Sequence, residues 1–334
     1  MTKRIFTLVA IVFLLCSSAI YVYGWGVWGH SKINRGAILA LPKEMGMFFY
    51  NHADFITEEA VAADIRKYTM GDKTENPRHY IDLENYNYTT PAAMPASADA
   101  ASAKFSKDTV DKYGTLPWTI IEMTDKLTKA FKTKNKSEIL FLAANLAHYI
   151  GDAHMPLHTT INHDGQFTGQ KGIHALWESQ LPELFGNNYS FYADARYMPD
   201  VDKATWNIID SSNKLIARLL YNDKKMRKDK PEEMLYKLAP NGAPEKNRYG
   251  QVVHAYEYAH VYHELLDHMV ERQLRAAITA TASYWYTAWV NAGKPDLTDL
   301  DPKYITERNA KFYLEDIKYW KKGKVTGYKV KNEF

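Results

Sequence analysis

Apolar residues recur every three or four positions along several stretches of the chain. In 137–150, the sequence SEILFLAANLAHYI places its apolar side chains on one face of a helix, with Ser137 as candidate N-cap and Pro156 beyond the end. Residues 118–131 have the same period and follow Pro117. Each pattern predicts an amphipathic helix that buries one face in a core.

Other stretches extend this picture to most of the chain. Residues 203–222 and 251–292 predict two more helices, of which the second is long. Residues 87–104 are rich in Ala, Thr, Ser and Pro, and 222–250 contains a lysine run and a Pro-Asn-Gly turn, so both predict loops. Alternating strand patterns are scarce. The sequence therefore predicts an all-α fold with a single compact multi-helix domain.

The first 24 residues have a different pattern. Lys3 and Arg4 precede an apolar run over 5–16, and small and polar residues follow as far as Gly24. This order is typical of a secretory signal peptide cleaved after Gly24. The run is shorter than the ~20 apolar residues of a membrane span, and the leucines before Cys16 lack the small residue that a lipoprotein cut prefers. We expect residues 1–24 to be removed and the protein to be periplasmic or extracellular.

Composition and charge exclude some classes of protein. Lys and Arg number 42 against 39 Asp and Glu, a balance too mild to indicate a nucleic-acid binder. The single cysteine, Cys16, excludes a disulfide framework and a cysteine-rich zinc finger. Residues 318–331 contain six lysines and no acidic residue. This stretch could contact an anionic surface, although a solvated extension is the simpler interpretation. We therefore divide the chain into 1–24, a domain at 25–295 and a C-terminal basic extension at 296–334.

Histidines paired with carboxylates are the strongest chemical signal. His148 lies on the helix predicted over 137–150, and Asp152 follows four residues later, before Pro156. If the helix continues that far, the two side chains lie one turn apart on one face, and His158 can fold back beyond Pro156. His174 and Glu178 repeat this spacing. Imidazole and carboxylate groups are good zinc ligands, so the two pairs predict a binuclear zinc site. Charge pairs on helix surfaces are the alternative.

Weaker candidates lie nearer the N-terminus. Asp64 and His79 carry little signal individually. Cleavage after Gly24 would leave Trp25 as the first residue, with His30 five positions later. A free α-amine has a pKa near 8 and can deprotonate onto a metal at modest cost.

Together, these positions resemble the zinc-dependent phospholipase C and single-strand nuclease superfamily. The resemblance rests on the following positions, which occur in the family's order: Trp25, His30, Asp64, His79, His148, Asp152, His158, His174 and Glu178. It implies a mainly α-helical domain with three zinc ions at the base of a cleft.

The resemblance also implies which residues hold each zinc. The first zinc would be held by Asp64, His79, His148 and Asp152; the second by His158, His174 and Glu178; the third by the amine and carbonyl of Trp25 with His30 and Asp152. The implied reaction is hydrolysis of phosphate esters, in which paired zinc ions activate a water molecule. Asp64 is the candidate catalytic residue that orients or deprotonates this water.

The spacings also bear on the substrate. The distances in sequence from Trp25 to His30 and from Asp64 to His79 resemble the nucleases. The last ligand, Glu178, and the short separation of His158 from His174 resemble the phospholipases C instead. We expect single-stranded nucleic acid as substrate, with an endonuclease or 3'-nucleotidase activity. Cleavage of phospholipid headgroups is the alternative.

A non-catalytic, zinc-stabilised binding module is a further alternative, although this ligand set differs from the closed, cysteine-rich sites of structural zinc. We expect a monomer without a protein partner or a transmembrane anchor. The substrate-binding residues are not identified by the sequence, although His163 and Asp164 could contact substrate or simply form a turn.

Overall fold

A computed structural model describes residues 25–228, 230–330 and 332–334. The predicted signal peptide, including Cys16, lies outside these residues. The centre of the molecule is built from helices that pack on one another: α2 (Gly26–Ala40), α8 (Leu116–Lys132), α9 (Lys136–Ala153) and α15 (Met269–Asn291). The ring of Trp285 on α15 stacks on Phe49 and donates a hydrogen bond from Nε1 to the Ala143 carbonyl of α9, at 3.1 Å.

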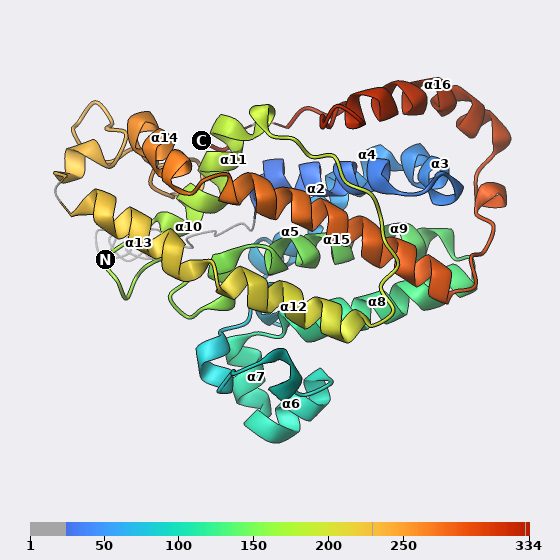
Figure 1. Ribbon diagram of the computed structural model, residues 1–334, viewed down its shortest axis with the longest axis horizontal. Helices are drawn as coiled ribbons and strands as arrows, with labels where there is room; N and C mark the ends of the chain where they lie inside the picture. Colours follow the sequence, from blue (N-terminus) through green and yellow to red (C-terminus); the bar gives the residue numbers. More distant parts are fainter. Residues whose placement is uncertain (1–24, 229, 331) are drawn as a thin grey trace, which may run out of the picture.

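Shorter elements surround this centre (Figure 1). The other α-helices are α3 (Lys43–Asn51), α4 (Ala53–Glu58), α5 (Ala62–Tyr68), α6 (Ala98–Phe105), α7 (Lys107–Tyr113), α10 (Ile173–Ala175), α11 (Leu181–Phe185), α12 (Val201–Asn213), α13 (Ile216–Arg227), α14 (Tyr256–Leu265) and α16 (Lys303–Trp320). Single 3₁₀ turns are Glu59–Val61, Asn76–His79, Leu83–Tyr86, Pro91–Ala93, Pro156–Thr159, Gly186–Asn188, Glu232–Met234 and Thr298–Leu300, and Leu176–Gln180 is a π-helical turn. In Figure 1, α6 and α7 project from the lower edge, and α16 runs along the upper edge.

The predicted fold class is confirmed. The described residues form a single helical domain and contain no β-strand, only isolated antiparallel bridges within 236–254. None of the helices in the described part of the chain has the length and apolar character needed to cross a bilayer.

Small residues let the central helices approach closely. A Cβ built on Gly151 of α9 would lie 3.1 Å from the His30 ring on α2, so a side chain there would crowd the histidine. A Cβ on Gly36 would lie 2.8 Å from Ile278 of α15. Because Gly36 and Gly151 have no side chain, α2 packs closely against α15 and α9. This close packing places His30 beside the last turn of α9.

Several helix boundaries differ from the predicted ones. The stretch 203–222 is split into α12 and α13, and α13 continues to Arg227 into the predicted loop. The predicted helix over 251–292 is split into α14 and α15, because Asp267 and His268 adopt the left-handed conformation, with φ of 50° and 57°. Part of the predicted loop at 87–104 forms α6.

The ends of the two central predicted helices agree with the structure more closely. The 137–150 helix exists as α9, but its cap is Asn135, whose side chain accepts from the Glu138 N–H, rather than Ser137. The 118–131 helix is α8, with Pro117 in its first turn.

The C-terminal extension is only partly solvated. The end of α16 is anchored by Trp320, which is 2% exposed. Beyond it, the Phe191 N–H donates to the Gly323 carbonyl at 2.9 Å, and Lys324 Nζ donates to the Asn187 carbonyl at 2.9 Å. The segment after α16 therefore packs back on the domain.

Candidate metal centre

The structure brings the side chains of the predicted ligands from distant segments to one buried place. They form three groups, and within each group the ligand atoms lie within 4.8 Å of one another: His30, His148 and Asp152; Asp64, His79 and His148; His158, His174 and Glu178. Their elements are α2, α5, the 3₁₀ turn Asn76–His79, α9, the 3₁₀ turn Pro156–Thr159, α10 and the π-helical turn. All of these side chains are buried.

Asp152 lies at the centre of this arrangement. Its Oδ2 is 3.0 Å from His79 Nδ1 and 3.3 Å from His148 Nε2. Its Oδ1 is 3.5 Å from both His30 Nε2 and His158 Nδ1. A carboxylate with imidazoles around both oxygens is placed to bridge two metal ions.

The remaining group lies on the other side of Asp152. Glu178 Oε2 is 2.7 Å from His174 Nε2, and Glu178 Oε1 is 3.4 Å from His158 Nε2. His174 and Glu178 are four residues apart, as the sequence pattern requires, but the helix widens from α10 into a π-helical turn between them. Such turns occur frequently at functional sites.

Backbone carbonyls fix the orientation of two of the histidine rings. His148 Nδ1 lies 2.8 Å from the Ala60 carbonyl, and His174 Nδ1 lies 2.9 Å from the His163 carbonyl. Because a carbonyl only accepts, each Nδ1 carries the proton in the neutral ring and each Nε2 presents a lone pair to the cluster. Metal-binding histidines are oriented in this way by hydrogen bonds from their other nitrogen.

Many atoms that face the cluster have no hydrogen-bond partner among the described residues. They are both ring nitrogens of His30, both oxygens of Asp64, Oδ1 of Asp152, Nδ1 of His158, Nε2 of His174 and both oxygens of Glu178. Buried polar atoms are normally satisfied, since desolvation without a partner costs about 1–3 kcal/mol for each group. Nitrogen and oxygen donors grouped in this way fit divalent zinc.

Trp25 is fixed beside the cluster through its side chain. Its indole is 0% exposed, lies 5.0 Å from the Trp177 ring, and donates from Nε1 to the Gly151 carbonyl at 2.6 Å. Gly151 directly precedes Asp152. The Trp25 backbone therefore lies at the start of α2, near Asp152, with which the family resemblance pairs it.

Burial and neighbouring charges shift the pKa values in the cluster. Burial opposes charge on His148, but Asp152 and Asp64 outweigh it and raise its pKa to about 9. Burial lowers the pKa of His30 and that of His158, which favours the neutral, ligating form of both rings. Burial raises the pKa of Glu178 to about 7 despite the opposing His174.

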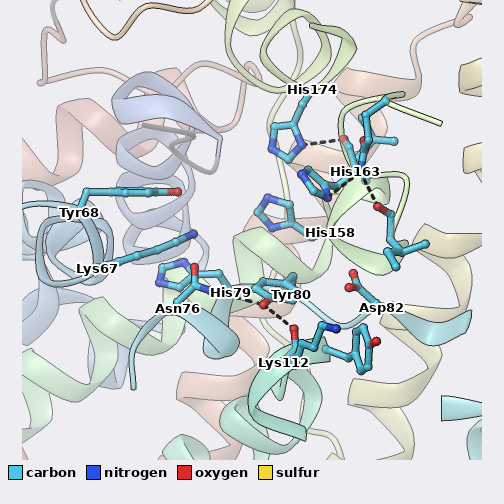
Figure 2. Close-up of a pocket in the computed structure, with 14 residues that line it drawn as sticks. Lys67, Tyr68, Asn76, His79, Tyr80, Asp82, Lys112, His158, His163 and His174 are labelled. Atoms are coloured by element: carbon cyan, nitrogen blue, oxygen red, sulfur yellow. Dashed lines mark hydrogen bonds between the residues drawn. The ribbon is translucent and has the colours of Figure 1, made fainter. Parts of the chain in front are cut away.

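A cavity of about 460 Å³ opens onto the cluster. His79, His158 and His174 contribute to its lining, together with the following residues: Lys67, Tyr68, Asn76, Tyr80, Asp82, Lys112, Tyr113, Leu157, Ile161, His163 and Gln166. Figure 2 shows Lys67 reaching from α5 toward the histidines, with Tyr80, Asp82 and Lys112 at the opposite end. The candidate metal centre is thus accessible from one side.

The sequence patterns do not predict most of this lining. Lys67 and Asp82 each follow a predicted ligand by three residues, and that proximity is the only signal that the sequence offers. His163 was a candidate for substrate contact, and its side chain does line the cavity. Asp164 instead stabilises the loop, because its Oδ1 accepts from the backbone N–H groups of Gly172 and His174 at 2.9 and 3.2 Å.

Comparison with known proteins adds two findings. The family model described as S1/P1 Nuclease matches residues 25–290. Nuclease S1 of Aspergillus oryzae (strain ATCC 42149 / RIB 40) is 25% identical over 190 residues, which are 52% of this chain and 60% of that relative. The matched part therefore spans three fifths of the relative's length.

Proposed function

The chain belongs to the S1/P1 nuclease family, and from that premise we propose that it is a zinc-dependent nuclease acting on single-stranded nucleic acid. The observation that carries the proposal is the set of buried, unpartnered ligand atoms grouped around Asp152 at the base of an open cavity. A centre that served only the fold would not need to be reached from a cavity.

We propose that the residues at this centre hold three zinc ions, with the assignment that the resemblance implies. All of the protein ligands would be side-chain atoms, except for the backbone amine and carbonyl of Trp25. Zinc bound there would lower the pKa of an attacking water and offset the charge that builds on the phosphoryl oxygens. Cleavage of the signal peptide after Gly24 and export from the cytoplasm are part of the same proposal, since the amine exists only after that cut.

The chain's own residues would then orient the substrate and move the proton. Asp64 is 0% exposed and neither of its oxygens has a hydrogen-bond partner among the described residues, so it can accept a hydrogen bond or a proton from the water. The Lys67 ammonium lies where it can contact a phosphate oxygen at the cavity side of the cluster.

The aromatic side chains that line the cavity favour an unpaired base. Tyr68, Tyr80 and Tyr113 bring aromatic rings to the lining, and an aromatic ring can stack on a base of any sequence. A base held in a duplex is already stacked on its neighbours, so a single strand would be the better substrate. Cleavage of phospholipid headgroups is a second candidate, favoured by Glu178 and by the short segment between His158 and His174.

The test uses protein whose N-terminus has been shown to be Trp25 by mass spectrometry. We expect hydrolysis of single-stranded DNA or RNA at rates well above those for duplex DNA and for phosphatidylcholine vesicles, loss of activity with a chelator, and recovery with zinc. Asp64→Asn should remove the activity, whereas Asp99→Asn on the surface of α6 should retain it. Hydrolysis of phosphatidylcholine alone would favour the phospholipase alternative, and zinc binding without turnover of any substrate would contradict the proposal.

A further inference from the structure

The last residues of the sequence return to the start of α2. After α16, the chain runs along this helix, where Arg35 Nε donates to the Thr326 carbonyl at 3.2 Å and Lys32 Nζ to the Val325 carbonyl at 3.4 Å. Figure 1 marks the end of the chain beside α11. This segment lies outside the 25–290 range that the family model matches. The family match therefore does not account for its contacts with α2.

Glu333 is the residue of this segment that reaches the first turn of α2. Its Oε1 accepts from the Val27 N–H at 3.3 Å, and its side chain is buried, with the residue 6% exposed. Glu183 of α11 holds it in place, because the carboxylate of Glu183 accepts from the backbone N–H groups of Glu333 and Phe334 at 2.8 and 2.9 Å. α2 itself offers no acidic side chain in its first turn and no side-chain cap at Trp25.

The second oxygen of Glu333 has no hydrogen-bond partner among the described residues. It lies against the backbone where α2 begins, since a Cβ built on Gly26 would be 3.1 Å away from this Oε2. Gly26 has a φ of +53°, which turns the chain between Trp25 and the helix. The unpartnered oxygen therefore lies close to Gly26, the residue that follows Trp25.

The charges around Glu333 are not balanced. Glu183 and Glu333 are both buried, and the one described cation within ion-pair distance is Arg248, whose Nη2 is 4.0 Å from Glu333 Oε1 and whose side chain is 45% exposed. Two buried carboxylates with one distant, solvated partner leave a site that favours an additional N–H donor or a positive group.

We propose that Glu333 is a positioning residue for the α-amine of Trp25, so that the C-terminal segment completes the metal centre. This inference rests on the proposed function, in which cleavage after Gly24 turns that amine into a ligand. An amine that binds a metal through its lone pair retains N–H groups, and Oε2 of Glu333 accepts one of them. A carboxylate that orients a ligand in this way increases the affinity for the metal.

The test compares Glu333→Gln with the parent and with Asn332→Ala, an exposed neighbour on the same segment. Gln retains an oxygen that can accept from Val27 but loses the charge. All three proteins must be shown to begin at Trp25, and their zinc is then counted during titration with a chelator. Removal of such an orienting partner costs about 10–100-fold in metal affinity. We therefore expect Glu333→Gln to release one zinc at a correspondingly lower chelator concentration, and Asn332→Ala to behave as the parent.

A second measurement examines the amine without metal. In chelator-treated protein, an amine that donates to Glu333 is less available to an acylating reagent, so the Trp25 peptide should be labelled faster in Glu333→Gln than in the parent or in Asn332→Ala. Equal zinc release and equal labelling in all three proteins would overturn the inference. Full zinc retention in a parent chain that keeps one residue ahead of Trp25 would instead contradict the proposed role of the amine itself.

Discussion

Asp223 and Asp64 are both wholly buried carboxylates, but their surroundings are opposite. Asp223 accepts from Arg227 Nε at 2.6 Å and Gln170 Nε2 at 2.8 Å on one oxygen, and from the Tyr258 hydroxyl at 2.6 Å on the other. Neither oxygen of Asp64 has a hydrogen-bond partner among the described residues. The first arrangement is complete in the protein alone, whereas under the proposed function the second would be completed by a bound cation.

The difference separates a cluster that is satisfied by its own contacts from the cluster proposed to bind metal. The residues around Asp223 connect α13, α14 and the loop before α10, and they hold the irregular 236–254 segment through Tyr236 and His254, which contact Arg227. The residues around Asp152 converge from seven separate elements yet leave their ligand atoms facing one another. We expect mutations in the first cluster to affect folding and mutations in the second to affect metal binding.

The largest effect should come from Asp152→Ala. Asp152 contacts four of the predicted histidine ligands, so its removal should reduce the zinc content and abolish hydrolysis of single-stranded nucleic acid. The increase in melting temperature on adding zinc should shrink as well, because a ligand stabilises only the state that binds it. Asp125→Ala, an exposed position on α8, serves as the control. Parent-like zinc content in Asp152→Ala would mean that the two clusters do not differ in this way.

The next largest effect should come from Asp223→Ala. The substitution leaves the guanidinium of Arg227 without its carboxylate, and breaking a buried ion pair costs about 3–5 kcal/mol. We expect a decrease of this size in the free energy of unfolding, measured with urea, both with and without zinc. The stabilisation by zinc should be unchanged. A loss of the zinc-dependent stabilisation in this variant would show that the clusters are coupled more strongly than their contacts indicate.

Gln170 links the cluster around Asp223 to the loop that contains His163. Its Nε2 donates to Asp223 and to the Leu220 carbonyl, both at 2.8 Å, and it ends the loop whose His163 carbonyl accepts from His174. Gln170→Ala should lower the free energy of unfolding by about 1–3 kcal/mol, because it leaves buried acceptors with fewer donors. It should also speed the release of zinc, as measured in a stopped-flow chelator assay. Lys171→Ala, which is exposed in the same loop, should change neither quantity.

The helix that bears His148 and Asp152 was predictable from the sequence, because spacing on one helix fixes which side chains share a face. The same reasoning paired His174 with Glu178, although it did not indicate the π-helical turn between them. The grouping of both pairs with Asp64 and His79 came from resemblance, since no local pattern connects residues that distant. The structure supplies the contacts that the local patterns could not.

Other features depended on long-range packing and were missed. The break between α14 and α15 requires left-handed Asp267 and His268, and neither residue type demands that conformation. Lys67 belongs to the cavity only because α5 lies against the cluster. The contact of Glu333 with α2 joins residues 306 positions apart, so only the folded chain reveals it.

The smallest effect concerns Asp82, a third buried carboxylate, which borders the cavity. Burial and then the charge of Glu84 raise its pKa to about 7, whereas an unfolded chain has a value near 3.9. An acid whose pKa is raised on folding favours the folded state below its unfolded pKa, and this contribution is lost as the pH rises through 7. Asp82→Asn should therefore stabilise the protein at pH 8 relative to the parent, and this gain should diminish steadily toward pH 4.

Urea unfolding at several pH values measures this gain in the free energy of unfolding, with the exposed Asp108→Asn as control. The gain should be smaller than the loss in Gln170→Ala, because the cavity admits water. A pH-independent difference would mean that Asp82, like Asp223, already has its charge satisfied.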